Sequence, residues 1–426
     1  MQYKNFFNNA KAKKITNIQI AETSTNYINI DVKNGKLSDY DVLFQKKYNV
    51  KAEYKGKTVK LNTEYLDDSI LELVKIKAEY TDTKYEDEYL NDTSNNNNNK
   101  LEKITDKDEV LKRLYQADSF RKKNSYIKEL NIYFEDENKV VRIINSNNVD
   151  ISTVSHIYEL CIEFVLEKDI IVNNYEKYIV TSYEELKIEE YIEKVYKETL
   201  KMLEKEKIES KKYDLILSQS VSGEILSHII SMISAGNIRQ KISCMDGKLN
   251  KKIFSEKITI VEDPTNNRLP GYSKFDYEGT KTYKKNIVEN GVLKTYLYDN
   301  KEAKQKNVKS TGNSYDGINT RNMYILPGEL SKEVLFKHLN NGLYITDYMG
   351  AMNSSIDTNS GNISLQVFGL IIEDGKIKKG FESSIMTTNI FELLSNVEHI
   401  SKDLNFSIIS AASPELLIKN ISIVAN

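Results

Sequence analysis

The chain has 426 residues, of which 40% are hydrophobic and 29% are charged. This length exceeds what one hydrophobic core usually serves, so we expect two domains. Its formal net charge of -2, from 60 basic and 62 acidic residues, provides no overall field for nucleic acid or an anionic membrane. No stretch approaches the roughly 20 apolar residues that span a bilayer, and residues 1–7 lack the apolar run of a secretory signal. Cys161 and Cys244, the two cysteines, predict reduced thiols and a cytoplasmic protein.

The first half is predicted to mix strands and helices. Asn34-Gly35 and Lys55-Gly56 each lie between strand-like runs and favour tight hairpins. The apolar positions at 130–144 predict a third hairpin. Helical spacing starts at Leu66 and again near residue 101, and an asparagine-rich stretch at 92–100 predicts a solvated loop between these two helices.

A long amphipathic stretch then joins the two halves. Residues 182–210 predict one connecting helix, whose charged positions surround an apolar stripe. Ser182 and Glu185 have the spacing of a capping box, in which the two side chains satisfy two unpaired amides at the helix start.

Beyond Tyr213 strands and turns dominate. Asn290-Gly291 and Asp374-Gly375 are flanked by strand-like runs, and all four prolines lie in this half. We therefore predict an α+β protein. A mixed N-terminal α/β domain, residues 1–210, precedes a largely antiparallel β domain, residues 211–426.

One segment of the second half has residues suited to chemistry. A short apolar strand at 213–217 leads into a predicted helix at 219–235. Glu224 and His228 are four residues apart and so share one face of that helix. The carboxylate could orient the imidazole, or the two could share a metal ion. A Glu–His pair at this spacing is more often a structural hydrogen bond, so the pair alone does not indicate catalysis.

This helix resembles the one that carries His-Glu-x-x-x-His in the TldD/PmbA family of metallopeptidases. In that family two histidines bind zinc, the glutamate is the general base, and a late cysteine completes the ligand set. Glu224 matches the glutamate and His228 the second histidine, but Gly223 stands where the first histidine should be. The cysteine-bearing turn corresponds to residues 406–413, which contain no cysteine. The family's histidines are five apart, about 140° around an ideal helix, which implies a local distortion.

The resemblance extends through the second half, in the order and spacing of several short segments. These are 271–280, the "ENGxLKxYL"-like hairpin at 287–298, and the segments 311–313, 342–346 and 360–361. Asp276, Glu278, Gly279 and Asn313 belong to them and are candidates for lining a substrate groove with an open strand edge. Each has an ordinary alternative role in a turn.

The resemblance implies a subunit close to the PmbA (TldE) side of the family. Members of this family are also known as modulators of DNA gyrase. Catalytic zinc normally needs three protein ligands, and His228 alone, even joined by Glu224, is too few. We therefore expect no cofactor in this chain and zinc in a TldD-like partner, with peptides or unfolded proteins as substrate. Two alternatives remain open: an autonomous or homodimeric zinc metallopeptidase with a rebuilt site, and a non-enzymatic peptide-binding protein. Direct DNA binding is not expected, because lysines and acids are interleaved.

Overall fold

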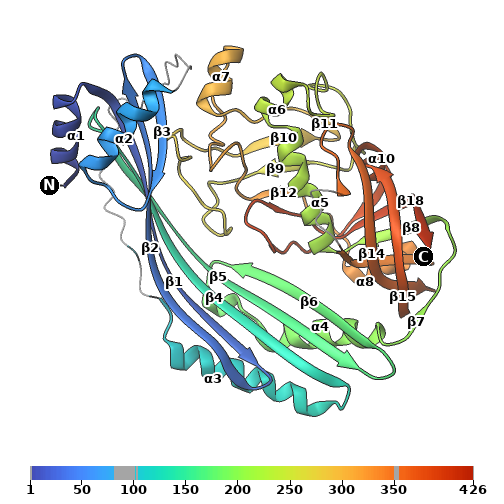
Figure 1. Cartoon of the computed structure of the whole chain (residues 1–426). Helices are drawn as coiled ribbons and strands as arrows, with labels where there is room; N and C mark the ends of the chain where they lie inside the picture. Colours follow the sequence, from blue (N-terminus) through green and yellow to red (C-terminus); the bar gives the residue numbers. More distant parts are fainter. Residues whose placement is uncertain (1, 81–100, 102–103, 350–354, 426) are drawn as a thin grey trace.

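The computed structural model describes residues 2–80, 101, 104–349 and 355–425, so the predicted loop at 92–100 lies outside the described residues (Figure 1). An antiparallel sheet of six strands forms the N-terminal half, and β1, β2 and β4 each run for 19 residues. These long strands curve around the C-terminal half in Figure 1. In spatial order the sheet consists of β3 (Lys57–Thr63), β2 (Lys36–Tyr54), β1 (Ile15–Lys33), β4 (Ile127–Asn145), β5 (Asp150–Glu167) and β6 (Ile171–Val180).

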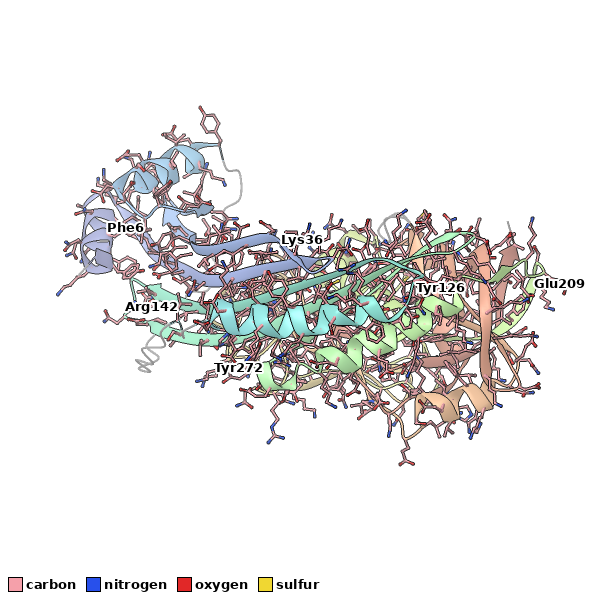
Figure 2. The ribbon with its side chains drawn as sticks, turned by 90° about the horizontal axis from the view of Figure 1, so that it is seen from below. Phe6, Lys36, Tyr126, Arg142, Glu209 and Tyr272 are labelled. Atoms are coloured by element: carbon pink, nitrogen blue, oxygen red, sulfur yellow. The ribbon has the colours of Figure 1, made fainter. Side chains whose placement is uncertain are left out.

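Helices cover one face of this sheet. Figure 2, seen from below, shows the two helices α3 and α4 lying across it. Alternate residues of β4 and β5, such as Ile132, Phe134 and Ile162, are buried beneath them, as the two-residue period of a strand requires. The same core continues into the C-terminal half through Tyr344 and Leu417. The helical elements of the N-terminal half are α1 (Gln2–Ala12), α2 (Asp68–Glu79), α3 (Lys107–Asp118), the 3-10 turns η1 (Ser119–Lys123) and η2 (Tyr183–Glu185), and α4 (Ile188–Lys201).

The C-terminal half contains two sheets. The larger has the order β16 (Val397–Ile400), β18 (Leu416–Ala425), β8 (Lys211–Leu217), β13 (Gly342–Met349), β14 (Asn362–Glu373), β15 (Lys376–Asn389) and β7 (Lys205–Glu206). The smaller has the order β11 (Val292–Leu293), β10 (Lys285–Glu289), β9 (Ile260–Glu262), β12 (Met323–Ile325) and β17 (Ala411–Ala412). Around them lie α5 (Gln219–Met232), α6 (Ala235–Gln240), α7 (Asn300–Lys306), α8 (Lys332–Leu339) and α10 (Ile390–Ser395).

Most strand pairs of this half are antiparallel, and the exceptions among the described strands are β13 with β8, β15 with β7, and β12 with β17. Since β18 pairs with both β8 and β15, the strands β8, β13, β14, β15 and β18 close into a ring. The predicted α+β class is confirmed. Among the described residues, no helix has both the length and the apolar character needed to cross a membrane.

The hairpins predicted from local sequence are confirmed. Asn34-Gly35, Lys55-Gly56, Asn290-Gly291 and Asp374-Gly375 all join adjacent antiparallel strands, and both residues of each pair have positive φ. Positive φ at both central positions defines the type I′ turn, which matches the twist of the flanking strands. These turns depend on two residues only, so the local sequence was sufficient to predict them.

The hairpin predicted at 130–144 is wrong. This segment is part of the single strand β4, which pairs with β1 on one side and β5 on the other. Its polar centre has the composition of a turn, but Asp136 and Asn138 are fully buried. The Asp136 carboxylate accepts hydrogen bonds from the backbone and hydroxyl of Thr105, both at 2.7 Å, and lies 2.6 Å from His156 Nε2. These distant partners allow the polar residues to remain inside a continuous strand.

The connecting helix predicted at 182–210 is shorter than expected. Ser182 precedes the 3-10 turn η2, and its hydroxyl bonds to the Glu184 carboxylate instead of capping a helix. Helix α4 begins at Ile188, ends at Lys201 and is followed by β7. The capping box predicted from Ser182 and Glu185 is therefore wrong, because the first turn after Ser182 is a separate 3-10 turn.

Candidate functional site

The candidate site is built on α5, which starts where the buried strand β8 ends. Residues 215–217 are fully buried, and β8 lies between β13 and β18. The Ser218 hydroxyl accepts a hydrogen bond from the Val221 amide at 3.3 Å and so caps the helix. The predicted helix at 219–235 is confirmed over Gln219–Met232, after which α6 begins at Ala235.

The first turn of α5 lies against the late segment in which the family's cysteine was expected. Gly223 is buried, and a Cβ added to it would lie 3.6 Å from both Ala412 Cα and the Ser413 amide nitrogen. Next to it the Ser222 hydroxyl donates to the Pro414 carbonyl oxygen at 3.0 Å. The structure thus brings together two positions that lie far apart in the sequence, and neither position has a histidine or a cysteine.

Gly223 and His228 occupy different faces of this helix. Five residues correspond to about 140° around a regular helix, and α5 is a continuous α-helix from Gln219 to Met232. The local distortion expected from the family's histidine spacing is not present. Gly223 accordingly faces β17, whereas the side chain of His228 is half-buried elsewhere on the helix.

Glu224 lies near side chains of β6 and β13. Burial raises the pKa of its carboxyl group, and Lys177 on β6 acts in the opposite direction. Burial also raises the pKa of Tyr348 on β13 to about 12, and the charge of Glu224 adds to this shift. Burial likewise raises the pKa of Tyr175 on β6, with smaller contributions that include Asp347 and Glu224. We call Glu224, Tyr175, Lys177, Asp347 and Tyr348 the Glu224 group.

Most of the Glu224 group was missed by the sequence analysis. Tyr175 and Lys177 come from the N-terminal half, and Asp347 and Tyr348 follow the residues of β13 that pair with β8. Only the packing of the two halves places them near α5, and no local motif marks them.

His228 stands apart from other candidate metal ligands in the part of the chain that the structure describes. Burial lowers the pKa of its imidazole, which favours the neutral form. Over the described residues, neither Glu224 nor any other side chain forms a hydrogen bond or ion pair with this imidazole. The described residues also contain no group of three or more histidine, cysteine, aspartate or glutamate side chains that could hold a metal ion. The donors present therefore do not fit a catalytic zinc ion, which normally has three protein ligands.

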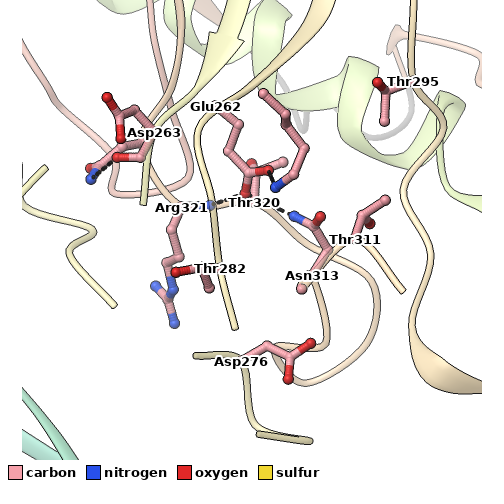
Figure 3. A network of polar contacts seen from close by, with 12 residues as sticks. Glu262, Asp263, Asp276, Thr282, Thr295, Thr311, Asn313, Thr320 and Arg321 are labelled. Atoms are coloured by element: carbon pink, nitrogen blue, oxygen red, sulfur yellow. Dashed lines mark hydrogen bonds and ion pairs between the residues drawn. The ribbon is translucent and has the colours of Figure 1, made fainter. Parts of the chain in front are cut away.

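A buried polar network also lies in the smaller sheet of the C-terminal half (Figure 3). Glu262 on β9 is fully buried and stands opposite Lys285 on β10, whose Nζ donates to Glu262 Oε2 at 2.6 Å. Glu262 Oε1 accepts from Asn313 Nδ2 at 2.8 Å and from the Arg321 amide at 3.0 Å. The sequence analysis did not identify Glu262 or Lys285, because only the strand register brings them together.

Asp276 fixes two loops to one another. Its Oδ1 accepts from the amides of Glu278 and Thr280 at 3.0 and 2.9 Å, and its Oδ2 accepts from the Ser314 amide at 3.0 Å. The side chain is fully buried, and burial, followed by the charge of Glu278, raises its pKa to about 7. All three bonds go to backbone groups of the chain itself, which is the geometry of a structural turn.

The remaining groove candidates belong to the same scaffold. Glu278 accepts from Lys60 Nζ at 3.3 Å and from the Asn300 amide at 3.0 Å, and so links β3 to the start of α7. Gly279 has φ +83°, which side-chain-bearing residues rarely adopt. Asn313 is fully buried beside Glu262. Among the described residues no hydrogen bond, ion pair or ring contact joins these residues to Glu224 or His228, so the structure separates the predicted site residues into two groups.

Replacing Gly223 by alanine provides a test of the contact between α5 and β17. A methyl group would meet its neighbours at an ordinary van der Waals distance of 3.6 Å, and alanine favours the helix. We expect Gly223→Ala to raise the free energy of unfolding by about 0.5–1 kcal/mol, measured by urea denaturation. Gly223→Leu extends beyond this contact and is expected to be destabilising. A destabilised alanine variant would show that the contact has no room for a methyl group.

Comparison with known proteins gives a consistent result. The family model of the PmbA/TldA metallopeptidase C-terminal domain matches residues 210–425. A metalloprotease PmbA homologue of Buchnera aphidicola is 32% identical over 199 residues, which are 47% of this chain and 43% of that relative. The metalloprotease PmbA of Escherichia coli O157:H7 is 27% identical over 198 residues, 46% of this chain and 43% of the relative. The alignments thus span less than half the length of these curated relatives.

Two solved structures share the fold along nearly the whole chain. TldE from Thermococcus kodakarensis superposes with a TM-score of 0.85 at 18% identity and covers 100% of both chains. A Thermotoga maritima protein described as a candidate modulator of a DNA gyrase has a TM-score of 0.87 at 23% identity and covers 99% of both. At such identities these two structures establish the fold alone. The family model, however, covers half of the 426 residues, and on that ground the chain belongs to the PmbA/TldD family of metalloproteases.

Proposed function

We propose that this chain is a PmbA/TldE-like subunit of a TldD/TldE-type metalloprotease. It supports the cleavage of unfolded or precursor peptides by a zinc-bearing, TldD-like partner and has no complete zinc site of its own. The observation that carries this proposal is the packing of Gly223 against Ala412 and Ser413. At this contact the scaffold around two ligand positions is retained while the ligands are absent.

The residues that remain suit binding better than bond cleavage. In the Glu224 group a half-buried carboxyl group with a raised pKa lies near two tyrosines and a lysine. Such side chains can donate and accept hydrogen bonds along an extended peptide. Among the described residues, they do not supply the three protein ligands that a catalytic zinc ion normally needs.

The test combines metal analysis with peptidase assays. The chain alone, the TldD-like subunit alone and their mixture are assayed for bound zinc and for cleavage of an unstructured peptide. We expect stable co-purification of the two subunits, zinc in the TldD-like subunit, and cleavage that is much faster in the mixture than with either protein alone. Glu224→Gln in this chain should alter the KM of the mixture more than its kcat, because the carboxyl group contacts peptide and not the reacting bond.

His228→Ala separates this proposal from an autonomous enzyme. The variant should leave the zinc content of this chain unchanged, and His338→Ala serves as the matched control for loss of an imidazole. About one tightly held zinc ion per chain, lost together with activity in His228→Ala, would show that the chain has a working metal site of its own. If the mixture were no more active than the TldD-like subunit alone, this chain would not support cleavage and the proposal would be wrong.

A further inference from the structure

A cavity of about 540 Å³ lies between the N-terminal sheet and two loops of the C-terminal half. Strands β1, β2 and β3, together with Lys77 of α2, form one wall, and the loops around Tyr277 and Asp316 form the other. No residue of α5 or of the Glu224 group lines this cavity, and Figure 1 shows β3 and α2 well away from α5. A volume of this size accommodates a small molecule or a few residues of a peptide. We call it the β3 cavity.

Three lysines converge on the β3 cavity. Gln19 of β1 stands opposite Lys51 of β2, and Lys51 stands opposite Lys60 of β3, so the three side chains form one row on the same face of the sheet. Lys77 Nζ donates to the Lys60 carbonyl oxygen at 2.8 Å, which places a third ammonium group beside this row. Like charges directly opposite in a ladder are destabilising. A bound anion would offset that repulsion.

The acidic residues of the lining leave this end of the cavity basic. Glu278 and Asp316 are the two acids among the lining residues, against three lysines. The Glu278 carboxylate already accepts from Lys60 Nζ at 3.3 Å and from the Asn300 amide at 3.0 Å. Lys60 and Asp316 are exposed, so the cavity opens to solvent on their side, whereas Lys51 is only 7% exposed.

A buried hydrogen-bond acceptor also faces the β3 cavity. Gln19 is 3% exposed, and its Oε1 has no hydrogen-bond partner among the described residues. A buried acceptor without a donor is costly, so such an atom in a native structure indicates a missing partner. A ligand that fits here therefore carries an N–H or O–H donor close to its negative charge.

Contacts between the two walls fix the shape of the β3 cavity. Gln19 Nε2 donates to the Glu278 carbonyl oxygen at 3.0 Å, and Lys60 forms the ion pair with the Glu278 side chain. The two loops are joined to each other, because the Tyr277 amide donates to the Ser314 carbonyl oxygen at 2.8 Å. A cavity whose walls are already fixed loses little conformational freedom when a ligand binds.

A second hollow, also of about 540 Å³, adjoins the β3 cavity and shares Asn49, Asn62, Tyr277 and Asp316 with it. Its further lining has two lysines and two glutamates, so these charges balance. The other side chains of this further lining are neutral and polar: Thr23, Thr25, Tyr27, Gln45, Tyr48 and Thr63. Hydroxyl groups both donate and accept hydrogen bonds, and so does the side-chain amide of glutamine, which suits the alternating donors and acceptors of a peptide backbone.

We propose that the β3 cavity binds the C-terminal carboxylate of a peptide. The carboxylate lies among Lys51, Lys60 and Lys77, the amide of the last residue donates to Gln19 Oε1, and the preceding residues occupy the adjoining hollow. A peptide end supplies an anion and an N–H donor a few atoms apart, whereas inorganic phosphate supplies the anion but few donors. This binding is separate from the function proposed above, because it needs neither a TldD-like partner nor the Glu224 group.

The test is isothermal titration calorimetry on the full-length chain, purified without any partner, with tri-alanine as the probe. We expect a dissociation constant of about 10⁻⁴ M for a ligand of this size. Tri-alanine amide should bind at least about tenfold more weakly, because it lacks the charge that the lysines recognise. N-acetyl-tri-alanine should bind as well as tri-alanine, because the cavity recognises the other end of the peptide.

Two lysines of α2 provide a matched pair of variants. Lys77→Met should weaken tri-alanine binding by about tenfold, because it removes one of the three ammonium groups. Lys75→Met removes a lysine from the same helix that pairs with Glu72 and does not line the cavity, and it should have no effect. Lys51→Met should abolish detectable binding. Circular dichroism checks its fold, and if that variant does not fold, Lys77→Met and the amide probe still decide the question.

Four results would overturn the proposal. Tri-alanine could fail to bind, or it could bind no better than its amide. Binding could be equally strong in the wild-type chain and in Lys77→Met. Finally, Glu224→Gln could abolish tri-alanine binding, which would place the peptide at α5 instead. Inorganic phosphate serves as a second probe: if it binds in a manner that requires Lys77 while tri-alanine does not bind, the cavity is a phosphate site and the assignment to a peptide end is wrong.

Discussion

Lys285→Met is expected to lower the free energy of unfolding by about 3–5 kcal/mol. Lys285 and Glu262 form an ion pair at 2.6 Å, and their side chains are only 4% and 0% exposed. Removing the lysine leaves the Glu262 carboxylate buried with two hydrogen-bond donors and no counter-charge. An uncompensated buried charge costs far more than the net contribution of the pair to stability. Chemical denaturation of the wild-type and variant chains measures the difference.

The double variant Glu262→Gln/Lys285→Met provides the internal control. The glutamine oxygen can still accept from Asn313 and the Arg321 amide, and no charge is left buried, so the double variant should lose less stability than Lys285→Met alone. The exposed pair Lys252–Glu256, 3.8 Å apart, is the matched surface control, and Lys252→Met should change stability by no more than about 0.5 kcal/mol. Equal losses for the buried and the surface lysine would show that Glu262 does not require its counter-charge.

The second large effect concerns pH. The pKa of Asp276 is raised to about 7 in the folded chain, from an ordinary value of 3.8. A carboxyl group with a raised pKa in the folded state contributes stability that is fully present below its unfolded pKa. That contribution is lost as the pH rises through the folded pKa. The free energy of unfolding of the wild-type chain should therefore fall by about 2 kcal/mol between pH 5 and pH 7, relative to Asp276→Asn, whose side chain does not titrate.

Asp316→Asn, at an exposed aspartate, controls for charge removal and should show no such slope. The comparison uses the difference between two chains, so other titrating groups common to both cancel. If the wild-type chain instead gained stability with rising pH relative to Asp276→Asn, the three amide donors to Asp276 would outweigh its burial.

Local sequence predicted the features that depend on a few neighbouring residues. The four hairpins followed from Asn-Gly, Lys-Gly and Asp-Gly pairs, since positive φ at two successive positions is a local requirement. Helix α5 followed from its apolar spacing, and the structure adds the cap by Ser218. The same local logic failed at 130–144 and at Ser182, where the deciding partners, Thr105 and η2, were not visible in the pattern itself.

The sequence by itself determined the hairpin turns, the fold class and the absence of histidine at Gly223 and of a cysteine after Cys244. Only the tertiary structure decided that Gly223 meets Ala412 and Ser413, and that Glu262 faces Lys285. The physical reason is the distance along the chain over which each interaction acts. Turn and helix preferences act over a few residues, whereas burial and ion pairing depend on strand register and domain packing, which join residues far apart in the chain.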